Sequence, residues 1–201
     1  MAADLEYVRS VGLSTSSVQT STYIDVSLAS MSDYKDAVII WQGFRSANDN
    51  DGTTLRMSFY HPTHGWSNSY HNSNWIYNRH SATAANYHSN NNPGAEISAK
   101  LTSHQTLYGW AQTGGMGCGI VEVINMHGTG SRSPNVFFQT GMPHSRQDST
   151  QAHQFETTIG IASAGVSWSG HTGPWESVRF TPYHDSWRSP TYFHVYGRKF
   201  S

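Results

Sequence analysis

Residues 37–60 begin with Ala37-Val38-Ile39-Ile40-Trp41 and end with Leu55-Arg56-Met57-Ser58-Phe59-Tyr60. The first run is rich in branched apolar residues and the second alternates apolar with polar residues, and both patterns are typical of β-strands. Between them, Asn48-Asp49-Asn50-Asp51-Gly52 is a strong turn signal, because Asn, Asp and Gly adopt the backbone conformations that tight turns require. This stretch therefore predicts two strands joined by a turn.

Further short apolar segments follow, each bounded by Gly, Pro, Ser or Asn. None has a 3.6-residue period over a useful length, so we expect no substantial helix. About nine to ten strands separated by turns predict an all-β fold, a two-sheet antiparallel sandwich of jelly-roll type. The remaining strands are expected at 75–77, 107–111, 119–126, 135–140, 155–161, 178–183 and 192–196.

The chain divides into a short first segment and one large domain. Residues 1–33 are rich in Ser and Thr and alternate only around Tyr23, Ile24, Val26 and Leu28, so they predict an N-terminal arm and a first short strand. Residues 34–201 are expected to form the jelly-roll domain. A chain of 201 residues fits this organisation, because all-β domains commonly reach about 200–250 residues as one unit.

The composition favours a neutral surface that forms hydrogen bonds. Charged residues make up 12% of the chain, about half of what soluble domains usually carry, and twelve basic against thirteen acidic residues give a formal charge of −1. Such a chain lacks the net positive electrostatic potential that attracts nucleic acid. No segment is long and apolar enough for membrane insertion. The N-terminus also lacks the pattern of a secretion signal. We expect partners that pack against polar surfaces, namely copies of this chain or sugars.

Catalytic machinery is not recognisable. Glycoside hydrolysis usually needs two nearby carboxyl groups, and neither Glu122 nor Glu156 has a second acid at strand spacing. No Gly-x-Ser-x-Gly motif is present, and the glycine-rich stretches lack the Lys and Ser or Thr of a phosphate-binding loop. We therefore expect no enzymatic activity and no cofactor.

Twelve histidines raise the question of a metal, above all in the His-rich segment 61–88. The histidines of this segment lack a thiolate or carboxylate at ligand spacing, so no metal site is expected and surface or interface roles are favoured. Its members are His61, His64, His71, His80 and His88.

Several other residues are expected in the core. Trp41, Trp110 and Trp175 lie within or beside apolar strand patterns, and Cys118, the single cysteine, is interpreted as a small core hydrophobe.

Residues 61–95 contain His, Asn, Ser and Tyr but few aliphatic residues, and we interpret them as a long polar loop. Trp66, Tyr70, Trp75 and Tyr77 lie in or beside it, where a core position explains them least. Exposed aromatic rings pack against partner proteins or stack on sugars. These four residues are therefore the candidate partner- or sugar-binding site, with partner packing as the first hypothesis.

Three stretches are similar to the β-jelly-roll modules of bacteriophage virion proteins, especially those of marine phages. Residues 37–45 with 54–59 resemble the opening hairpin of these modules, and 119–126 resembles their central strand. The closing segment, 178–182 followed by 189–199, resembles their last two strands, the final one ending in Tyr-Gly and a basic residue.

The resemblance implies a virion structural protein, either a capsid decoration or a tail-fibre or adsorption component. It also implies localisation in the virion and, as partners, other virion proteins and copies of this chain, with a host-surface glycan as a further possibility. The alternative is a carbohydrate-binding module that recognises glycans through exposed Trp and Tyr. A glycan-degrading enzyme ranks third.

Overall fold

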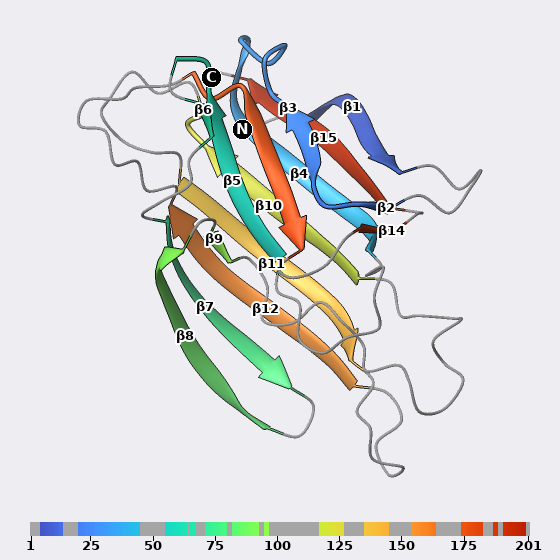
Figure 1. The fold of residues 1–201 in the computed structure, drawn as a ribbon, viewed down its shortest axis with the longest axis vertical. Helices are drawn as coiled ribbons and strands as arrows, with labels where there is room; N and C mark the ends of the chain where they lie inside the picture. Colours follow the sequence, from blue (N-terminus) through green and yellow to red (C-terminus); the bar gives the residue numbers. More distant parts are fainter. Residues whose placement is uncertain are drawn as a thin grey trace.

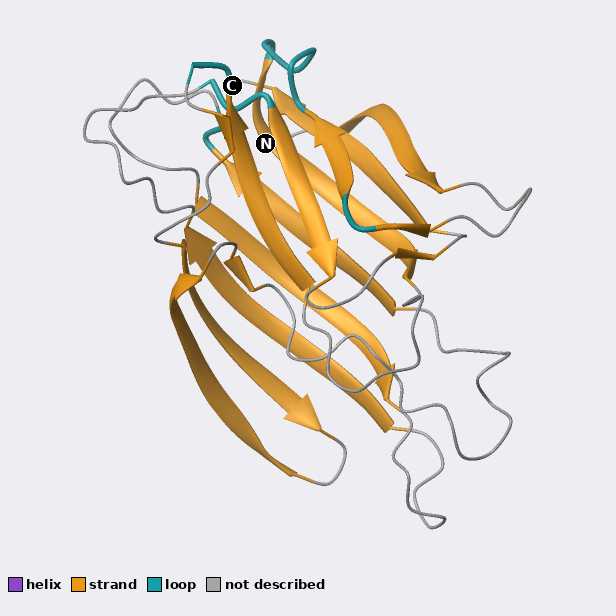
Figure 2. Ribbon diagram, viewed as in Figure 1, coloured by secondary structure: helices purple, strands orange, loops and turns teal. Residues whose placement is uncertain are grey.

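The computed structural model describes residues 5–13, 20–44, 55–63, 65–66, 71–79, 82–92, 95–96, 117–126, 135–144, 154–163, 174–182, 187–188 and 191–199. Within these residues the chain forms strands joined by loops and contains no helix (Figure 2). This part of the chain consequently holds no helix of the length and hydropathy that crossing a membrane requires. All the strand pairs are antiparallel.

The larger sheet has eight strands in the order β1-β15-β4-β10-β11-β12-β7-β8. Strands β10, β11 and β12 follow one another both in the chain and in the sheet, so they form a meander. The bounds are Leu5–Leu13 for β1, Tyr34–Phe44 for β4, His71–Arg79 for β7, Ala82–Asn92 for β8, Gly117–Ile124 for β10, Asn135–His144 for β11, Gln154–Ser163 for β12 and Thr191–Lys199 for β15.

The smaller sheet has five strands in the order β3-β13-β5-β6, with β9 also paired to β5. A separate pair joins β2 to β14. The bounds are Ile24–Ser27 for β3, Leu55–His61 for β5, Gly65–Trp66 for β6, Ala95–Glu96 for β9, Ser177–Pro182 for β13, Thr20–Ser21 for β2 and Trp187–Arg188 for β14.

The two sheets form the expected all-β antiparallel sandwich. In Figure 1 the smaller sheet lies over the part of the larger sheet that holds β4, β10 and β11, whereas β7 and β8 extend beyond it. The chain passes between the sheets from β3 to β4 to β5 and again from β12 to β13 to β15.

The core lies between the sheets because apolar residues alternate along the strands that face each other. In β15, Thr191, Phe193 and Val195 are buried while the residues between them are only partly covered. The ring of Phe193 stacks on that of Phe180 from β13, with centroids 4.5 Å apart, and so joins the two sheets. The core cluster comprises Ile24, Val26, Leu28, Met31, Ala37, Ile39, Trp41, Met57, Phe59, Val121, Val123, Met126, Val136, Phe138, Trp175, Val178, Phe180, Phe193 and Val195.

Trp41 and Trp175 are buried, which confirms their prediction as core residues, whereas Trp110 lies outside the described residues. Trp175 packs edge-on against Phe59, and its backbone nitrogen donates to the carbonyl of Met126 at 3.2 Å. The ring contact attaches the segment before β13 to β5, and the hydrogen bond attaches it to the residues just after β10.

Three features differ from the sequence-based expectations. Residues 37–45 and 54–59 resemble a hairpin, but the strands that they form, β4 and β5, lie in different sheets and do not pair with each other. The stretch interpreted as an arm contains β1, which pairs with β15 along most of its length. The segment interpreted as a polar loop contains β7 and β8, so its interpretation as loop is wrong for those residues. Backbone pairing can hold polar strands in a sheet without an apolar alternation, and for that reason the sequence pattern did not reveal them.

Candidate functional site

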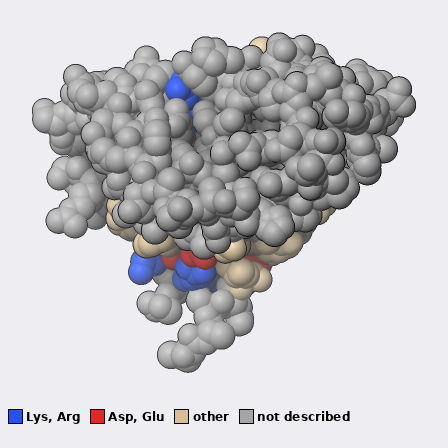
Figure 3. Space-filling view, turned by 90° about the horizontal axis from the view of Figure 1, so that it is seen from below, with Lys and Arg blue, Asp and Glu red and all other residues tan. Residues whose placement is uncertain are grey.

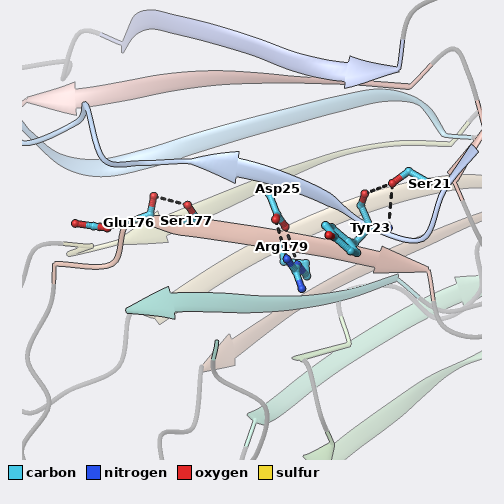
Figure 4. A network of polar contacts seen from close by, with 6 residues as sticks. All are labelled: Ser21, Tyr23, Asp25, Glu176, Ser177 and Arg179. Carbon is cyan, nitrogen blue, oxygen red and sulfur yellow. Dashed lines mark hydrogen bonds and ion pairs between the residues drawn. The ribbon is translucent and has the colours of Figure 1, made fainter. Parts of the chain in front are cut away.

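The outer face of the smaller sheet carries a cluster built around Arg179 of β13. Strand alternation sends Val178 and Phe180 into the core and leaves Arg179 on the opposite face. The register places Arg179 directly opposite Asp25 of β3. Arg179 donates to both carboxylate oxygens of Asp25, at 2.7 Å from Nε and 2.8 Å from Nη2 (Figure 4).

Two aromatic rings complete this cluster. The Arg179 guanidinium carbon lies 3.7 Å from the ring centroid of Tyr23 and 4.0 Å from that of Trp66. The ring of Trp66 in turn contacts that of Tyr60, with centroids 5.3 Å apart. We call these five residues the arginine stack. They connect β3, β13, β5 and β6 across the outer face of the sheet.

The contacts of the arginine stack favour the protonated form of the Arg179 guanidinium. The hydrogen bonds from Arg179 to Asp25 raise the pKa of the guanidinium. Because the guanidinium lies over one face of Tyr23 and one face of Trp66, those two faces are occupied. Tyr23 still exposes 44% of its surface, whereas Trp66 is half-buried. Tyr23 is therefore the more accessible ring of the stack.

The four aromatic residues predicted as a site do not form one group among the described residues. Trp66 lies in the smaller sheet, while Trp75 and Tyr77 lie on β7 of the larger sheet, opposite Gly160 and Thr158 in the backbone register. Tyr70 lies outside the described residues.

Four members of the arginine stack, Tyr23, Asp25, Tyr60 and Arg179, were missed as site residues. Period-two alternation in Val178-Arg179-Phe180 is the signal that assigns Arg179 to the outer face. Its partners on β3 could not be found in the same way, because the pairing of β13 with β3 brings together residues that are 154 positions apart.

The outer face of the larger sheet presents apolar side chains across three neighbouring strands. Ile40 of β4 is directly opposite Ile120 of β10, and Phe137 of β11 lies diagonally from Ile120 on the same face. Ile40 exposes 38% and Phe137 54% of its surface, and Ile120 is half-buried. We call these three residues the apolar stripe.

Paired charges lie beside the apolar stripe. Arg198 of β15 contacts the buried carboxylate of Asp36 at 3.3 Å and that of Glu122 at 3.5 Å. Glu122 is opposite Phe137 in the register, so this ion-pair network adjoins the stripe. Basic and acidic side chains also lie side by side on the part of the surface coloured in Figure 3. Among the described residues, the acids beside the stripe are therefore paired with a basic side chain.

The residues considered for metal binding or core packing have other environments. His61 is buried, and its Nδ1 accepts a hydrogen bond from the backbone nitrogen of Thr63 at 3.1 Å. The described part of the chain contains no group of three or more potential metal ligands. His64 and His80 lie outside that part.

Cys118 is exposed, so its interpretation as a core residue is wrong. Val121 and Val123 of the same strand point inward, and Cys118 belongs to the opposite set of alternating positions, which faces away from the core.

Comparisons of the chain with protein-family models, with curated proteins and with solved structures find no match. What the site can do therefore rests on its own chemistry. The arginine stack and the apolar stripe both present aromatic or aliphatic side chains at the surface, which are side chains that partner proteins commonly contact.

Proposed function

We propose that this chain is a structural protein of a bacteriophage virion, a capsid decoration or a fibre or adsorption component, that acts by assembly. The observation that carries the assembly role is the apolar stripe of Ile40, Ile120 and Phe137 on the outer face of the larger sheet. Contiguous exposed apolar surface commonly marks a protein interface. We expect this face to be covered in the assembled state.

Charge supports a second copy of the chain as what covers the stripe. The acids beside it are already paired with Arg198, and the whole chain has a formal charge of −1. Two such faces can approach each other with little electrostatic repulsion, and proteins with near-zero net charge associate more readily. The setting in a virion rests on the resemblance to phage modules of 37–45 with 54–59, of 119–126, and of 178–182 with 189–199.

Glycan binding stays as the second candidate because of one observation. Tyr23 offers an exposed ring beside Asp25 and Arg179, and sugar sites commonly combine an aromatic face with charged hydrogen-bonding groups. The Arg179 guanidinium lies over one face of each ring, but Trp66 is half-buried whereas Tyr23 exposes 44% of its surface, which weighs against Trp66 as the stacking platform. If this protein binds a glycan here, Tyr23 is the ring to test.

The assembly role is tested by the mass of the protein in solution over a range of concentrations, for the wild type and two Phe137 variants. Phe137→Asp should shift the protein towards the monomer, whereas Phe137→Leu, which keeps an apolar side chain, should retain assembly. Asn135→Asp adds the same charge on the same strand without removing apolar surface and serves as the control. A wild-type protein that stays monomeric at all concentrations would refute the assembly role.

The virion setting and the glycan alternative need separate measurements. Peptides of this chain should be found in purified particles of the phage that encodes it, at a copy number compatible with particle symmetry, and their absence from the particles would exclude this setting. A glycan array with the wild type and Tyr23→Ala tests the alternative. Sugar binding that is lost in Tyr23→Ala while assembly persists would favour the carbohydrate-binding module.

A further inference from the structure

Strand β1 is attached to the edge of the larger sheet and contributes no residue to the buried core cluster. Its residues alternate between exposed and half-buried, with Leu5 47% and Tyr7 58% exposed. Val8, Val11 and Leu13 pack against the core from outside. Removing β1 from this edge would therefore take no member out of the buried core cluster, although it would uncover the side chains that Val8, Val11 and Leu13 cover.

The contacts that hold β1 are nevertheless specific. Glu6 accepts a hydrogen bond from the hydroxyl of Tyr34 at 2.8 Å and forms an ion pair with Lys199 at 2.7 Å. The Oγ of Ser10 is 2.6 Å from Nδ1 of His194, directly opposite in the register. Each of these partners belongs to β4 or β15.

Tyr7 adds a ring contact with the same receiving edge. Its ring meets that of Tyr196 of β15 edge-on, with centroids 5.7 Å apart. Strand β15, together with Tyr34 of the adjacent β4, thus forms the binding site for β1. This site makes the same contacts whether β1 belongs to the same chain or to another copy.

We propose that β1 is exchanged between copies of this chain, so that β1 of one copy pairs with β15 of its neighbour. This inference rests on the proposed assembly role and names the element that links the copies. Exchange of an identical element replaces each contact with the same contact, so little free energy opposes it beyond that of association. Strand β1 is the element best suited to exchange. Among the long strands of the larger sheet whose side chains are described, it is the one strand without a buried residue.

The linker between β1 and β2 has a composition compatible with this exchange. Residues 14–19 are Ser-Thr-Ser-Ser-Val-Gln, without Pro, Gly or charge. Six residues span at most about 20 Å when extended. The neighbour's β15 edge must therefore lie within that reach, which requires close packing of the two copies.

The exchange is tested by disulfide trapping between single-cysteine chains in a Cys118→Ser background. One chain carries Ser10→Cys and the other His194→Cys, and the two are unfolded, mixed and refolded together at high concentration before oxidation. Neither chain can form this disulfide within itself. If β1 is exchanged, a covalent heterodimer appears on a denaturing gel, and the double variant Ser10→Cys/His194→Cys gives covalent dimers or longer ladders.

A matched pair controls for random collision. Ser27 of β3 is opposite Ser177 of β13, and β3 contributes the buried residues Ile24 and Val26 to the core, so it should not exchange. A mixture of Ser27→Cys and Ser177→Cys chains should give no heterodimer above background. Heterodimer formation to the same extent in both mixtures would overturn the proposal.

Failure of the exchange and failure of the assembly role give different results. If the protein has the mass of an oligomer but the double variant is cross-linked only within each chain, β1 stays in its own copy and the exchange is refuted. If the wild type is a monomer at every concentration, the assembly role itself is refuted.

Discussion

Arg179 combines two contacts that depend on the flat, forked shape of its guanidinium. It donates two parallel hydrogen bonds to Asp25, and the same group lies over the rings of Tyr23 and Trp66. A lysine ammonium carries the same charge but forms neither the paired hydrogen bonds nor the planar contact. Shape rather than charge therefore distinguishes the arginine stack from an ordinary surface ion pair.

Arg179→Lys should lower the free energy of unfolding by about 1 kcal/mol, because partly exposed cation–π contacts and ion pairs each contribute roughly 0.5–1 kcal/mol. Urea unfolding of Arg179→Lys, Asp25→Asn and the double variant measures the coupling. We expect the two effects to be less than additive, since both changes remove the same pair of hydrogen bonds. Additive effects would show that the two side chains act independently.

Gly119 leaves the space that the Trp41 indole occupies. A Cβ at this position would lie 2.5 Å from Nε1 and 2.6 Å from Cε2 of that ring, which is fully buried. Gly119→Ala should therefore destabilise the fold by about 1–3 kcal/mol, the usual range for overpacking a tight core. Chemical unfolding of Gly119→Ala in the wild type and in Trp41→Phe tests the cause. The smaller ring should reduce the loss, and an equal loss in both backgrounds would mean that Trp41 is not responsible.

At the scale of elements, the attachment of β1 depends on an ionised Glu6. Hydrogen bonds from Lys199 and Tyr34 lower the pKa of the Glu6 carboxyl below its ordinary value of 4.5. A carboxyl whose pKa is lower in the folded state stabilises that state above its unfolded pKa, and the contribution is lost as pH falls through the folded value. The tie between β1 and the sheet is therefore present at neutral pH and weakens in acid.

The test compares the urea midpoints of the wild type and Glu6→Gln from neutral pH down to pH values below the ordinary carboxyl pKa. Glu6→Gln should be less stable than the wild type at neutral pH, and the difference should vanish in acid, where the wild-type carboxyl is also uncharged. The difference should be small and should shrink in high salt, because the group is exposed. A difference that is independent of pH would assign the role of Glu6 to packing rather than charge.

The elements predictable from sequence were those that bury one face. Strands β4, β5, β10, β11, β13 and β15 supply residues to the core, and their apolar patterns predicted their approximate positions. Strand β7 was expected only at 75–77. The rest of β7 and all of β8 have few aliphatic residues, and β1 lies at an edge, so pattern alone did not distinguish these residues from loops or an arm. Trp66 was found as a candidate because of its polar surroundings. Arg179 needed the register between β13 and β3, which pairs distant parts of the chain.

On the scale of the whole molecule, the surfaces that we propose for contact lie on both outer faces of the sandwich and at one edge. The smaller sheet carries the arginine stack, the larger sheet carries the apolar stripe, and β1 forms an edge of the larger sheet. A subunit with surfaces in several directions can contact more than one neighbour, as an extended assembly requires. Low net charge permits this close packing, so a change in net charge should oppose it.

Acidification supplies such a change through the twelve histidines. With neutral histidines the formal net charge is −1, and histidine is the side-chain type that gains its charge as pH falls from about 8 to 5, so each one that is protonated adds one positive charge. Copies should then repel each other, so the mass in solution should fall between pH 7.5 and pH 5.5 in low salt. Salt distinguishes general repulsion from a specific switch, because screening acts on exposed charges separated by more than about 10 Å at 0.1 M. If assembly at pH 5.5 returns in high salt, net charge controls it. If assembly stays lost at pH 5.5 in high salt while the fold is intact, the protonation of a buried or interfacial group causes the loss instead. If the mass in solution does not change with pH at all, charge does not govern association.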